Sequence, residues 1–390
     1  MLWTTIHIIE IILWIFMAGS VFYVLFFALA SLLPSRRSSS ETEKNNEARF
    51  SFLVLFPAYG EDRVIINSIE NFLKQDYPAD KFDITVISDH MTDETNEKLN
   101  RLPVKVLQPV FKKSSKAKAL QFAMSHTEKV YDYVVILDAD NIVHTDFLQR
   151  LDNSCRRGYQ AIQCHRCAKN AENSIAMLDS VSEEINNTVF RKAHNRIGLS
   201  SALIGSGMCF AFAWFRNNVN HLSTAGEDRE LEALLLQQRI FIRYEEHIHV
   251  FDEKVSNEEN FQSQRLRWMS AQISCLLSML PKAPKQIAAG NIDFVDKTIQ
   301  QMLLPRSILL LGTAVMAVIM FAVATVWCAK WWILFALLCL AMFLAIPSAM
   351  RTRSIFSRII ALPRLVLKML NNIKRIDKSS KDFIHTTHDK

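Results

Sequence analysis

The sequence predicts an α/β domain with a mostly parallel sheet, attached to three transmembrane helices. In the middle of the chain, short apolar runs alternate with amphipathic stretches, which is the pattern of strands alternating with helices. Toward the two ends, long uncharged apolar runs appear instead. Half of the 390 residues are hydrophobic and 22% are charged. A chain of this length accommodates one sizeable α/β domain together with membrane segments.

Three apolar runs are long enough to cross a bilayer. The first covers residues 11–33, and a helix of about 23 residues spans a hydrocarbon core of about 30 Å. The second and third cover residues 308–328 and 331–350, separated only by Ala329 and Lys330. This short separation predicts a tight helical hairpin that turns at Lys330.

A cleaved signal peptide is the alternative for the first run. Ala28-Leu29-Ala30 has the small-x-small pattern of a cleavage site. The residues before the run, however, include Glu10 and neither Lys nor Arg. We therefore expect an uncleaved transmembrane helix.

Arginines lie at one end of each predicted span. They are Arg36 and Arg37 after the first, Arg306 before the second, and Arg351, Arg353 and Arg358 after the third. The positive-inside rule places these flanks in the cytosol. The chain is thus expected to be a multi-pass protein of the inner (plasma) membrane, with its large middle domain in the cytosol.

The formal net charge of +6 does not predict a nucleic-acid partner. Much of the excess lies in the tail after the third span, where membrane lipid with anionic headgroups is the simpler partner. The seven cysteines are scattered, and two of them lie inside predicted spans. No disulfide framework is implied.

Composition divides the chain into six segments. In chain order, they are a transmembrane helix (1–34), a polar linker (35–49), a globular domain (50–281), an interfacial amphipathic helix (282–304), a transmembrane hairpin (305–350) and a basic cytosolic tail (351–390).

Functional residues are expected where the predicted strands of the globular domain end. Tyr59, Asp89 and Asp138 each follow an apolar run. The carboxyl ends of parallel strands meet at one edge of a sheet, and ligands bind beyond that edge. The three residues are therefore expected to converge on one site.

Asp138-Ala139-Asp140 directly follows the apolar run at 134–137. A tight turn there can present two carboxylates to a hard divalent cation, Mg²⁺ or Mn²⁺, that bridges phosphates. Such a cation neutralises the charge that develops when a sugar leaves a nucleotide diphosphate. The same pattern is also common in ordinary turns.

Two further segments, at Asp89 and at Lys116 and Lys118, could contact a nucleotide diphosphate. Asp89 could accept hydrogen bonds from a base or ribose, or could be a solvated loop residue. Lys116 and Lys118 could pair with phosphates, or could simply open a helix. The position of the lysines between two strand ends favours the phosphate role.

The acids of Gly226-Glu227-Asp228 precede a helical run at 230–238. They could simply favour the helix N-terminus. The alternative is that Asp228 is a general base that deprotonates an acceptor hydroxyl. One base suffices, because the metal serves the leaving group.

A later helix carries Gln264, Arg267 and Trp268 on neighbouring turns. Together they offer an amide, a guanidinium suited to a diphosphate, and an aromatic face suited to a sugar ring. A surface helix with a buried Trp is the other interpretation.

One metal-like spacing, Cys164-His165-Arg166-Cys167, is set aside because no second Cys pair follows it. His247 and His249 alternate on a predicted strand, where solvent-facing histidines are the common outcome. A role for His249 as a third contact to the metal is the alternative.

In order, the motifs closely resemble those of the family 2 glycosyltransferases, over residues 50–271. They are Phe56-Pro57-Ala58-Tyr59-Gly60-Glu61, Asp89, Lys116, Asp138-Ala139-Asp140, Gly205-Ser206-Gly207, Glu227-Asp228 and Gln264-x-x-Arg267-Trp268. The flanking spans look like those of membrane-bound members related to cellulose, chitin and hyaluronan synthases.

The resemblance implies the GT-A fold, which is the Rossmann-like fold of nucleotide-diphospho-sugar transferases, and a role for each motif. For the donor, it implies contacts to the nucleotide base by Ala58, Tyr59, Glu61 and Asp89, and to the diphosphate by Lys116, Asp138, Gln264 and Arg267. It also implies a metal ion bound by Asp140 with Asp138, and an acceptor site bordered by Gly205, Ser206, Gly207 and Trp268. Asp228 would be the general base of an inverting reaction. A UDP-sugar is the donor it suggests.

Two positions depart from the family pattern. Gly60 replaces a common Asn, and Gly226 replaces a common Thr. Neither change removes a carboxylate. Three spans are also fewer than the largest polysaccharide synthases use, which puts a wide translocation channel in doubt.

The function expected from these observations is inverting, metal-dependent transfer of a sugar from a nucleotide diphosphate to a glycan or lipid acceptor at the cytosolic membrane face. One alternative is a processive synthase that exports its polymer. Another is a non-catalytic membrane scaffold that binds nucleotide sugars, although such a protein would not need Asp89, Asp138, Asp140 and Asp228 together. A nucleotidyltransferase would not need the Gln-x-x-Arg-Trp helix.

Overall fold

The computed structural model of the chain describes residues 2–34, 49–169, 174–224, 226–254, 258–323 and 325–352. Nearly all of the predicted linker and basic tail, at 35–48 and 353–390, lies outside the described residues. The described part divides into two compact units. The sheet unit holds residues 49–180 and 199–301, and the apolar-helix unit holds residues 2–34, 181–198 and 302–352.

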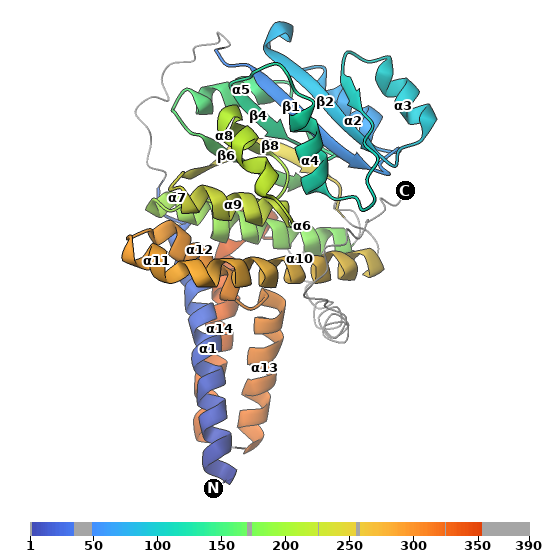
Figure 1. Cartoon of the computed structure of the whole chain (residues 1–390). Coiled ribbons are helices and arrows are strands. Elements are labelled where there is room, and N and C mark those ends of the chain that lie inside the picture. Colours follow the sequence, from blue (N-terminus) through green and yellow to red (C-terminus); the bar gives the residue numbers. More distant parts are fainter. Residues whose placement is uncertain are drawn as a thin grey trace. The chain divides into compact units, whose positions relative to one another are not determined.

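The sheet unit is built on one sheet of eight described strands in the order β3-β2-β1-β4-β7-β6-β8-β5. They are β1 (Phe52–Tyr59), β2 (Phe82–Asp89), β3 (Lys105–Leu107), β4 (Tyr133–Ile136), β5 (Ile142–Val143), β6 (Ala161–Ala168), β7 (Met208–Ala211) and β8 (Ile242–Asp252). Figure 1 labels β1, β2, β4, β6 and β8 among the helices of this unit.

The first half of this sheet is parallel, as the sequence predicts. β1 pairs in parallel with both β2 and β4, and β2 pairs in parallel with β3. The second half is mixed, because β7 runs antiparallel to β4 and β6. β6 pairs in parallel with β8, and β5 runs antiparallel to β8.

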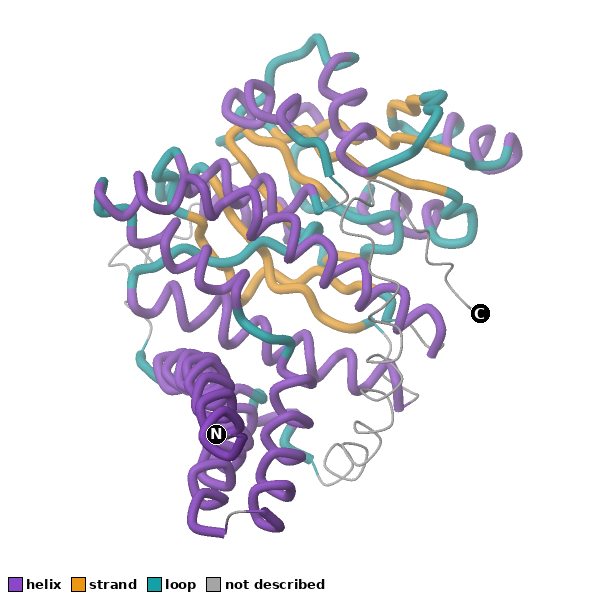
Figure 2. Tube along the Cα trace, turned by 60° about the horizontal axis from the view of Figure 1, so that its bottom comes forward, coloured by secondary structure: helices purple, strands orange, loops and turns teal. Residues whose placement is uncertain are grey.

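Helices cover both faces of the sheet, so the apolar strands are buried on both sides. Residues alternate between faces along a strand. Leu53 and Leu55 of β1 therefore enter one core, and Phe52, Val54 and Phe56 enter the other. In Figure 2 the strands accordingly lie between helices. The first core is closed by α4 (Lys116–Ser125), α8 (Phe212–Asn218) and α9 (Glu227–Gln237), and the second by α2 (Ile65–Phe72), α3 (Asp93–Asn100) and α5 (Phe147–Cys155).

The chain leaves the sheet unit through three successive helices. They are α10 (Glu258–Met279), α11 (Ala283–Ala288) and α12 (Ile292–Met302). The segment predicted as one interfacial helix is thus two, broken at Gly290, whose φ of +67° suits glycine. Phe294 of α12 is fully buried in the first core, while Ile287 and Ile292 are exposed.

The apolar-helix unit contains three helices that are long and apolar enough to cross a membrane. They are α1 (Leu2–Ala30), α13 (Arg306–Val323) and α14 (Thr325–Ala345). The unit also contains the end of α6 (Ser174–Asn186), a π-helical segment (Asn187–Lys192) and α7 (Ala193–Ile197). The helical turn predicted at Lys330 lies earlier in the chain, between α13 and α14, so Lys330 belongs to α14.

An ion pair explains why Lys330 lies in a helix and not in the turn. The buried carboxylate of Glu10, on α1, accepts hydrogen bonds from Lys330 Nζ at 2.8 Å and from Trp331 Nε1 at 2.6 Å. Lys330 Nζ also lies 4.9 Å from the centre of the Trp327 ring. A paired ammonium group tolerates apolar surroundings that would exclude an unpaired one.

Replacing Glu10 with Ala is expected to destabilise the apolar-helix unit, because it leaves Lys330 and the Trp331 N–H without their shared acceptor. Breaking a fully buried pair costs roughly 3–5 kcal/mol, and the cost here should be smaller because Lys330 is 21% exposed. The measurement is thermal stability: the detergent-solubilised protein is heated, and size-exclusion chromatography gives the temperature at which half of the monodisperse peak is lost. The double variant Glu10→Leu/Lys330→Leu should recover much of the loss, and no recovery would contradict the ion-pair interpretation.

Candidate functional site

The candidate site begins at the ends of β1 and β2. Tyr59 and Asp89 are the last residues of these strands and face each other in the parallel register. The N–H of Gly60 donates to the Asp89 carbonyl at 3.0 Å, and Gly60 adopts a φ of +61° that suits glycine. The departure from the family pattern at Gly60 thus coincides with a left-handed turn.

A histidine that the sequence analysis did not single out joins this part of the site. His90 Nδ1 lies 2.6 Å from Oδ1 of the buried Asp89, and the His90 ring lies 5.0 Å from the Tyr59 ring. His90 has a φ of +56°, an uncommon conformation for a residue other than glycine. The two rings could stack on a planar nucleotide base, and the buried carboxylate beside them could accept hydrogen bonds from that base.

Two other residues predicted at the base lie close by in the chain but differ in surroundings. Ala58 is buried in the second core, so it can reach a ligand only through its backbone. The N–H of Glu61 lies 3.0 Å from the sulfur of Met91.

Lys116 lies at the centre of the site. It is the first residue of α4, whose N-terminus is capped by Ser115. Its Nζ donates to the carboxylate of Asp138 and to the Gly205 carbonyl at 2.7 Å, and lies 3.6 Å from Glu227 Oε1. Burial alone would lower the pKa of Lys116, but Asp138, Glu227 and Asp228 outweigh it and raise the pKa. Lys116 is therefore a permanent cation among three acids.

The turn after β4 presents the two carboxylates that the sequence predicts. The N–H of Asp138 donates to Asn141 Oδ1 at 2.9 Å, which closes the turn. Asp140 is buried, and its Oδ2 accepts from the N–H of Glu253 at 2.8 Å. Asn141 also bonds to Ser206, so it fixes the turn from two sides; the sequence analysis did not identify it.

These oxygen ligands fit a divalent cation. A carboxylate has about four lone-pair positions, so single hydrogen bonds to its oxygens leave room for a metal bond. Mg²⁺ and Mn²⁺ prefer such oxygen ligands. Asp138 is one-third exposed and can reach a bound phosphate, whereas Asp140 is held by its surroundings.

Gly205-Ser206-Gly207 borders the site, and its backbone packs closely against neighbouring side chains. Gly205 and Gly207 have φ of +81° and +64°, which favour glycine. A Cβ on Gly207 would come within 3.0 Å of Val250 Cγ2. A Cβ on Gly205 would lie 3.6 Å from Glu227 Oε1 and 3.9 Å from Asp228 Oδ2, so Gly205 borders both acids.

The first turn of α9 carries the remaining acids. Glu227 is buried, and its pKa is raised to about 7 by burial and by Asp228 and Asp138, against the opposing effect of Lys116. Asp228 is less buried, and its Oδ1 accepts from the N–H of Arg229 at 2.8 Å. The structure thus separates the roles of two adjacent carboxylates, since Glu227 faces Lys116 inside the protein and Asp228 is the more accessible.

The raised pKa of Glu227 predicts a pH-dependent stability for the metal-free, donor-free protein. From about pH 4.5 to about pH 7, the folded chain keeps a proton on Glu227 that the unfolded chain releases. The stabilisation is complete below the ordinary pKa of 4.5 and is lost as the pH rises through about 7. Thermal midpoints measured across this range should fall with pH in the parent protein. In Glu227→Gln this part of the slope should disappear, and an unchanged slope would contradict the assignment.

Gly226, the other departure from the family pattern, lies where α9 meets α10. A Cβ at this position would come within 2.9 Å of Ala271 Cβ, closer than two such atoms can approach. The absence of a side chain therefore allows α10 to pack directly on the start of α9, beside Asp228.

Gly226→Ala is expected to push α10 away from α9 and to lower turnover, by up to about 10²-fold if catalytic groups move by about 1 Å. The rate of nucleotide diphosphate release measures this. Adding Ala271→Gly should restore the space and much of the rate, and failure of that rescue would contradict the packing argument. Gly19→Ala is the matched control, because a Cβ on Gly19 meets nothing within 4 Å.

The guanidinium of Arg267, on α10, interacts with the acidic side chains of the site. Burial lowers the pKa of Arg267, against the attraction of Glu227, Asp138 and Asp228. Arg267 therefore lies close enough to interact with all three. Gln264 Oε1 is buried without a hydrogen-bond partner among the described residues.

The neighbouring Arg265 has a structural role that the sequence analysis did not anticipate. Arg265 Nη2 donates to Asp179 Oδ1 of α6 at 2.6 Å, and its guanidinium lies 4.7 Å from the centre of the Trp268 ring. These contacts hold α10 against α6 and orient Trp268.

The assembled groups can perform two tasks. Lys116, Arg267 and the carboxylates at Asp138 and Asp140 can hold a diphosphate together with a divalent cation. Asp228 can accept a proton from a hydroxyl that approaches from the Gly205 side.

The sequence of the globular part is similar to a known protein family and to a characterised glycosyltransferase. Residues 53–219 match the family described as "Glycosyl transferase family 2". Poly(ribitol-phosphate) beta-N-acetylglucosaminyltransferase TarS of Staphylococcus aureus is 26% identical over 102 residues, which are 25% of this chain. The match spans 18% of the length of that relative.

A solved structure with the same architecture is that of the mannosyltransferase PcManGT from Pyrobaculum calidifontis, in complex with GDP-Man and Mn²⁺. It is 16% identical, with a TM-score of 0.57 over 90% of this chain and 95% of PcManGT. TarS of S. aureus in complex with UDP-GlcNAc is 14% identical, with a TM-score of 0.45 over 84% and 91% of the two chains. The PcManGT likeness confirms the predicted GT-A fold.

Proposed function

We propose that the chain transfers a sugar from a nucleotide diphosphate, UDP in our proposal, to a glycan or lipid acceptor at the cytosolic face of the inner membrane, since residues 53–219 match the glycosyl transferase family 2. The observation that carries the proposal is the convergence on Lys116. This buried cation contacts Asp138 and Gly205 and lies 3.6 Å from Glu227, so it joins the metal-binding turn to the start of the helix that bears the base.

The donor diphosphate would lie between Lys116 and Arg267. Both cations face the same acids, and in the absence of donor these acids compensate their charge. When the donor binds, the negative charge of its diphosphate would take over part of the role of these acids in balancing Lys116 and Arg267. Asp138 and Asp140 would hold Mg²⁺ or Mn²⁺, which supplies Lewis-acid stabilisation of the leaving phosphate.

Asp228 is the proposed general base. Its Oδ2 lies 3.9 Å from the Cβ position of Gly205, so the space next to it is not filled by a side chain at that residue. Asp228 takes the proton of the acceptor hydroxyl, and the hydroxyl oxygen forms the new bond to the anomeric carbon as the bond to the phosphate breaks. Attack opposite the leaving group inverts the configuration at that carbon.

Glu227 is the proposed positioning residue for Lys116. Its buried carboxyl faces the lysine and is isolated from an incoming acceptor by its burial. A proton or the lysine can neutralise it, so it does not compete with Asp228 for the acceptor hydroxyl.

The base of the donor would contact Tyr59, Asp89 and His90. TarS is named for transfer of N-acetylglucosamine to poly(ribitol-phosphate), and PcManGT was solved with GDP-Man. These names support a nucleotide-sugar donor and leave both uracil and guanine as bases to compare. The three apolar helices support an acceptor at or near the membrane.

The experiment is a donor panel with the detergent-solubilised protein. UDP- and GDP-sugars are supplied with Mn²⁺, Mg²⁺ or EDTA in the presence of lipid and glycan acceptors, and free nucleotide diphosphate is followed. Metal-dependent release from one UDP-sugar is expected. Binding of a donor without release from any of them would favour the scaffold alternative.

A further inference from the structure

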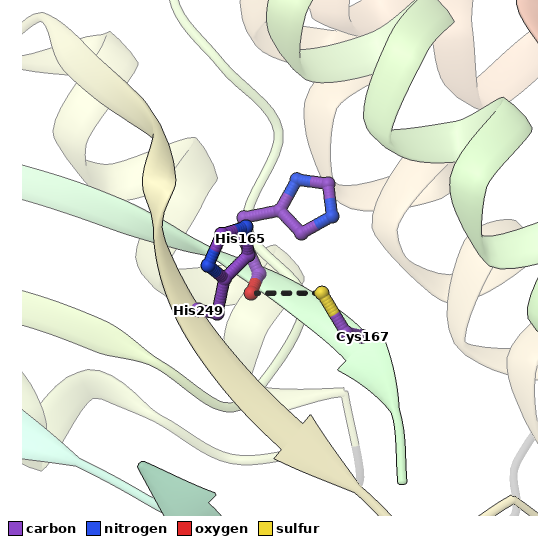
Figure 3. Close-up of side chains that lie close together, drawn as sticks. All are labelled: His165, Cys167 and His249. Atoms are coloured by element: carbon purple, nitrogen blue, oxygen red, sulfur yellow. Dashed lines mark hydrogen bonds between the residues drawn. The ribbon is translucent and has the colours of Figure 1, made fainter. Parts of the chain in front are cut away.

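A second group of metal-binding side chains lies on β6 and β8. His165 and Cys167 are two residues apart on β6, so they share a face of the strand, and His249 is the register partner of His165 on β8. Their ligand atoms all lie within 4.8 Å of one another. Figure 3 shows the three side chains close together on the two strands.

An irregularity in the strand pairing creates this arrangement. Cys164 pairs with Glu245, but the next residue, His165, pairs with His249. The three intervening residues of β8 have no partner on β6, and this shift places the two imidazoles side by side. The motif Cys164-His165-Arg166-Cys167 lacks a second Cys pair nearby, yet a strand far along the chain provides the third ligand.

The chemistry of the three side chains selects a particular class of ion. Two imidazoles and one thiolate suit Zn²⁺ and related transition-metal ions, whereas Mg²⁺ prefers oxygen. Three protein ligands leave one position of a tetrahedral site for water. In such a site the ligand atoms lie roughly 3.5 Å apart, so small side-chain rotations would close the cluster around an ion.

The surroundings of the histidines support coordination. Tyr244 Oη lies 2.5 Å from His165 Nδ1, and such a bond to one ring nitrogen orients a metal-binding imidazole. The His249 ring lies 5.2 Å from the His165 ring, measured between ring centres.

The cluster is separate from the carboxylate pair of the candidate site. Asp140 contacts the N–H of Glu253, which lies four residues beyond His249. Four residues of extended strand cover about 13 Å. The two groups also differ in ligand type, since one offers oxygen alone and the other nitrogen and sulfur.

We propose that His165, Cys167 and His249 bind a zinc-class transition-metal ion at a site distinct from Asp138 and Asp140. The ion joins β6 to β8 and so stiffens the strand pair whose end holds Asp140 in place.

The test is metal binding by the full-length, detergent-solubilised chain with its affinity tag removed. After chelation and dialysis, we expect one equivalent of Zn²⁺ to bind and to raise the thermal midpoint. Co²⁺ in place of Zn²⁺ should give a thiolate charge-transfer absorption. Cys167→Ser should abolish that absorption, and Cys167→Ser and His249→Ala should each weaken Zn²⁺ binding at least about tenfold.

Two controls make the result decisive. His247→Ala removes a histidine of the same strand whose side chain is 80% exposed, and it should leave Zn²⁺ affinity unchanged. Cys167→His keeps three ligands, so it should retain Zn²⁺ but lose the thiolate absorption even if Cys167→Ser folds poorly. No Zn²⁺ bound, equal affinity in the ligand variants, or loss of Zn²⁺ in Asp140→Asn would overturn the proposal.

Discussion

Asp228→Asn is expected to lower the rate of sugar transfer by roughly 10²–10⁴-fold, which is the usual contribution of a general base. The amide cannot accept the proton of the acceptor hydroxyl, but it keeps nearly the same size and can still accept from the N–H of Arg229. Donor affinity should change little, because Lys116, Asp138 and Arg267 remain. The measurements are initial rates of nucleotide diphosphate release and the dissociation constant of the donor.

Glu230→Gln is the matched control for this result. Glu230 lies in the same helical turn, but its carboxylate accepts from the N–H of Ser223 at 2.7 Å, away from Lys116. Its replacement should leave turnover within a few-fold of the parent. An active Asp228→Asn enzyme, or an equal loss in Glu230→Gln, would show that Asp228 is not the base.

Asp140→Ala is expected to produce the second large loss, because it removes a carboxylate from the proposed metal site. Loss of metal stabilisation amounts to several kcal/mol, so turnover should fall roughly 10²–10³-fold. Metal-dependent donor binding should weaken with it. EDTA should have the same effect on the parent protein, and added Mn²⁺ should reverse that loss but not the loss in the variant.

The control for this variant is Asp83→Asn, at the opposite end of the sheet. Asp83 is the register partner of Leu53 near the start of β1, and its carboxylate pairs with Lys129 at 2.6 Å. The Asp83→Asn variant should retain metal-dependent turnover. Full activity of Asp140→Ala in the presence of EDTA would contradict a catalytic metal at the turn after β4.

The parts of the fold that depend on local pattern could be predicted from the sequence. β1 and β4 carry continuous apolar runs because helices cover both faces of the sheet. β1 and β2 end at Tyr59 and Asp89, as expected, and Asp138 follows two residues after β4 ends. The antiparallel β7 was not anticipated. It is only four residues long, and its partners β4 and β6 are far from it in the chain, so no local periodicity marks it.

The residues of the site that were missed act through tertiary contacts. His90 depends on a left-handed turn and Asn141 on its bond to Ser206. Glu227 was named as part of a motif, but its own role follows from its burial against Lys116. None of these contacts leaves a periodic pattern or a fixed motif spacing in the sequence. A glycine where relatives have a side chain was the visible signal at Gly226, but only the approach of Ala271 explains it.

The hairpin turn was placed too late for a related reason. A lysine between two apolar runs is usually exposed at a turn, and Lys330 was interpreted in that way. Its partner Glu10 lies on a different helix, more than three hundred residues earlier, so the sequence around Lys330 could not show that its charge is compensated.

The most direct test of the account is the anomeric configuration of the product formed from the donor that the panel identifies. The linkage is read by nuclear magnetic resonance of the purified product of the parent protein, with Asp228→Asn run in parallel. We predict a β-linked product from an α-linked donor and, in the same time, at least about a hundredfold less product from the variant. A product that retains the donor configuration would contradict direct displacement with Asp228 as the single base.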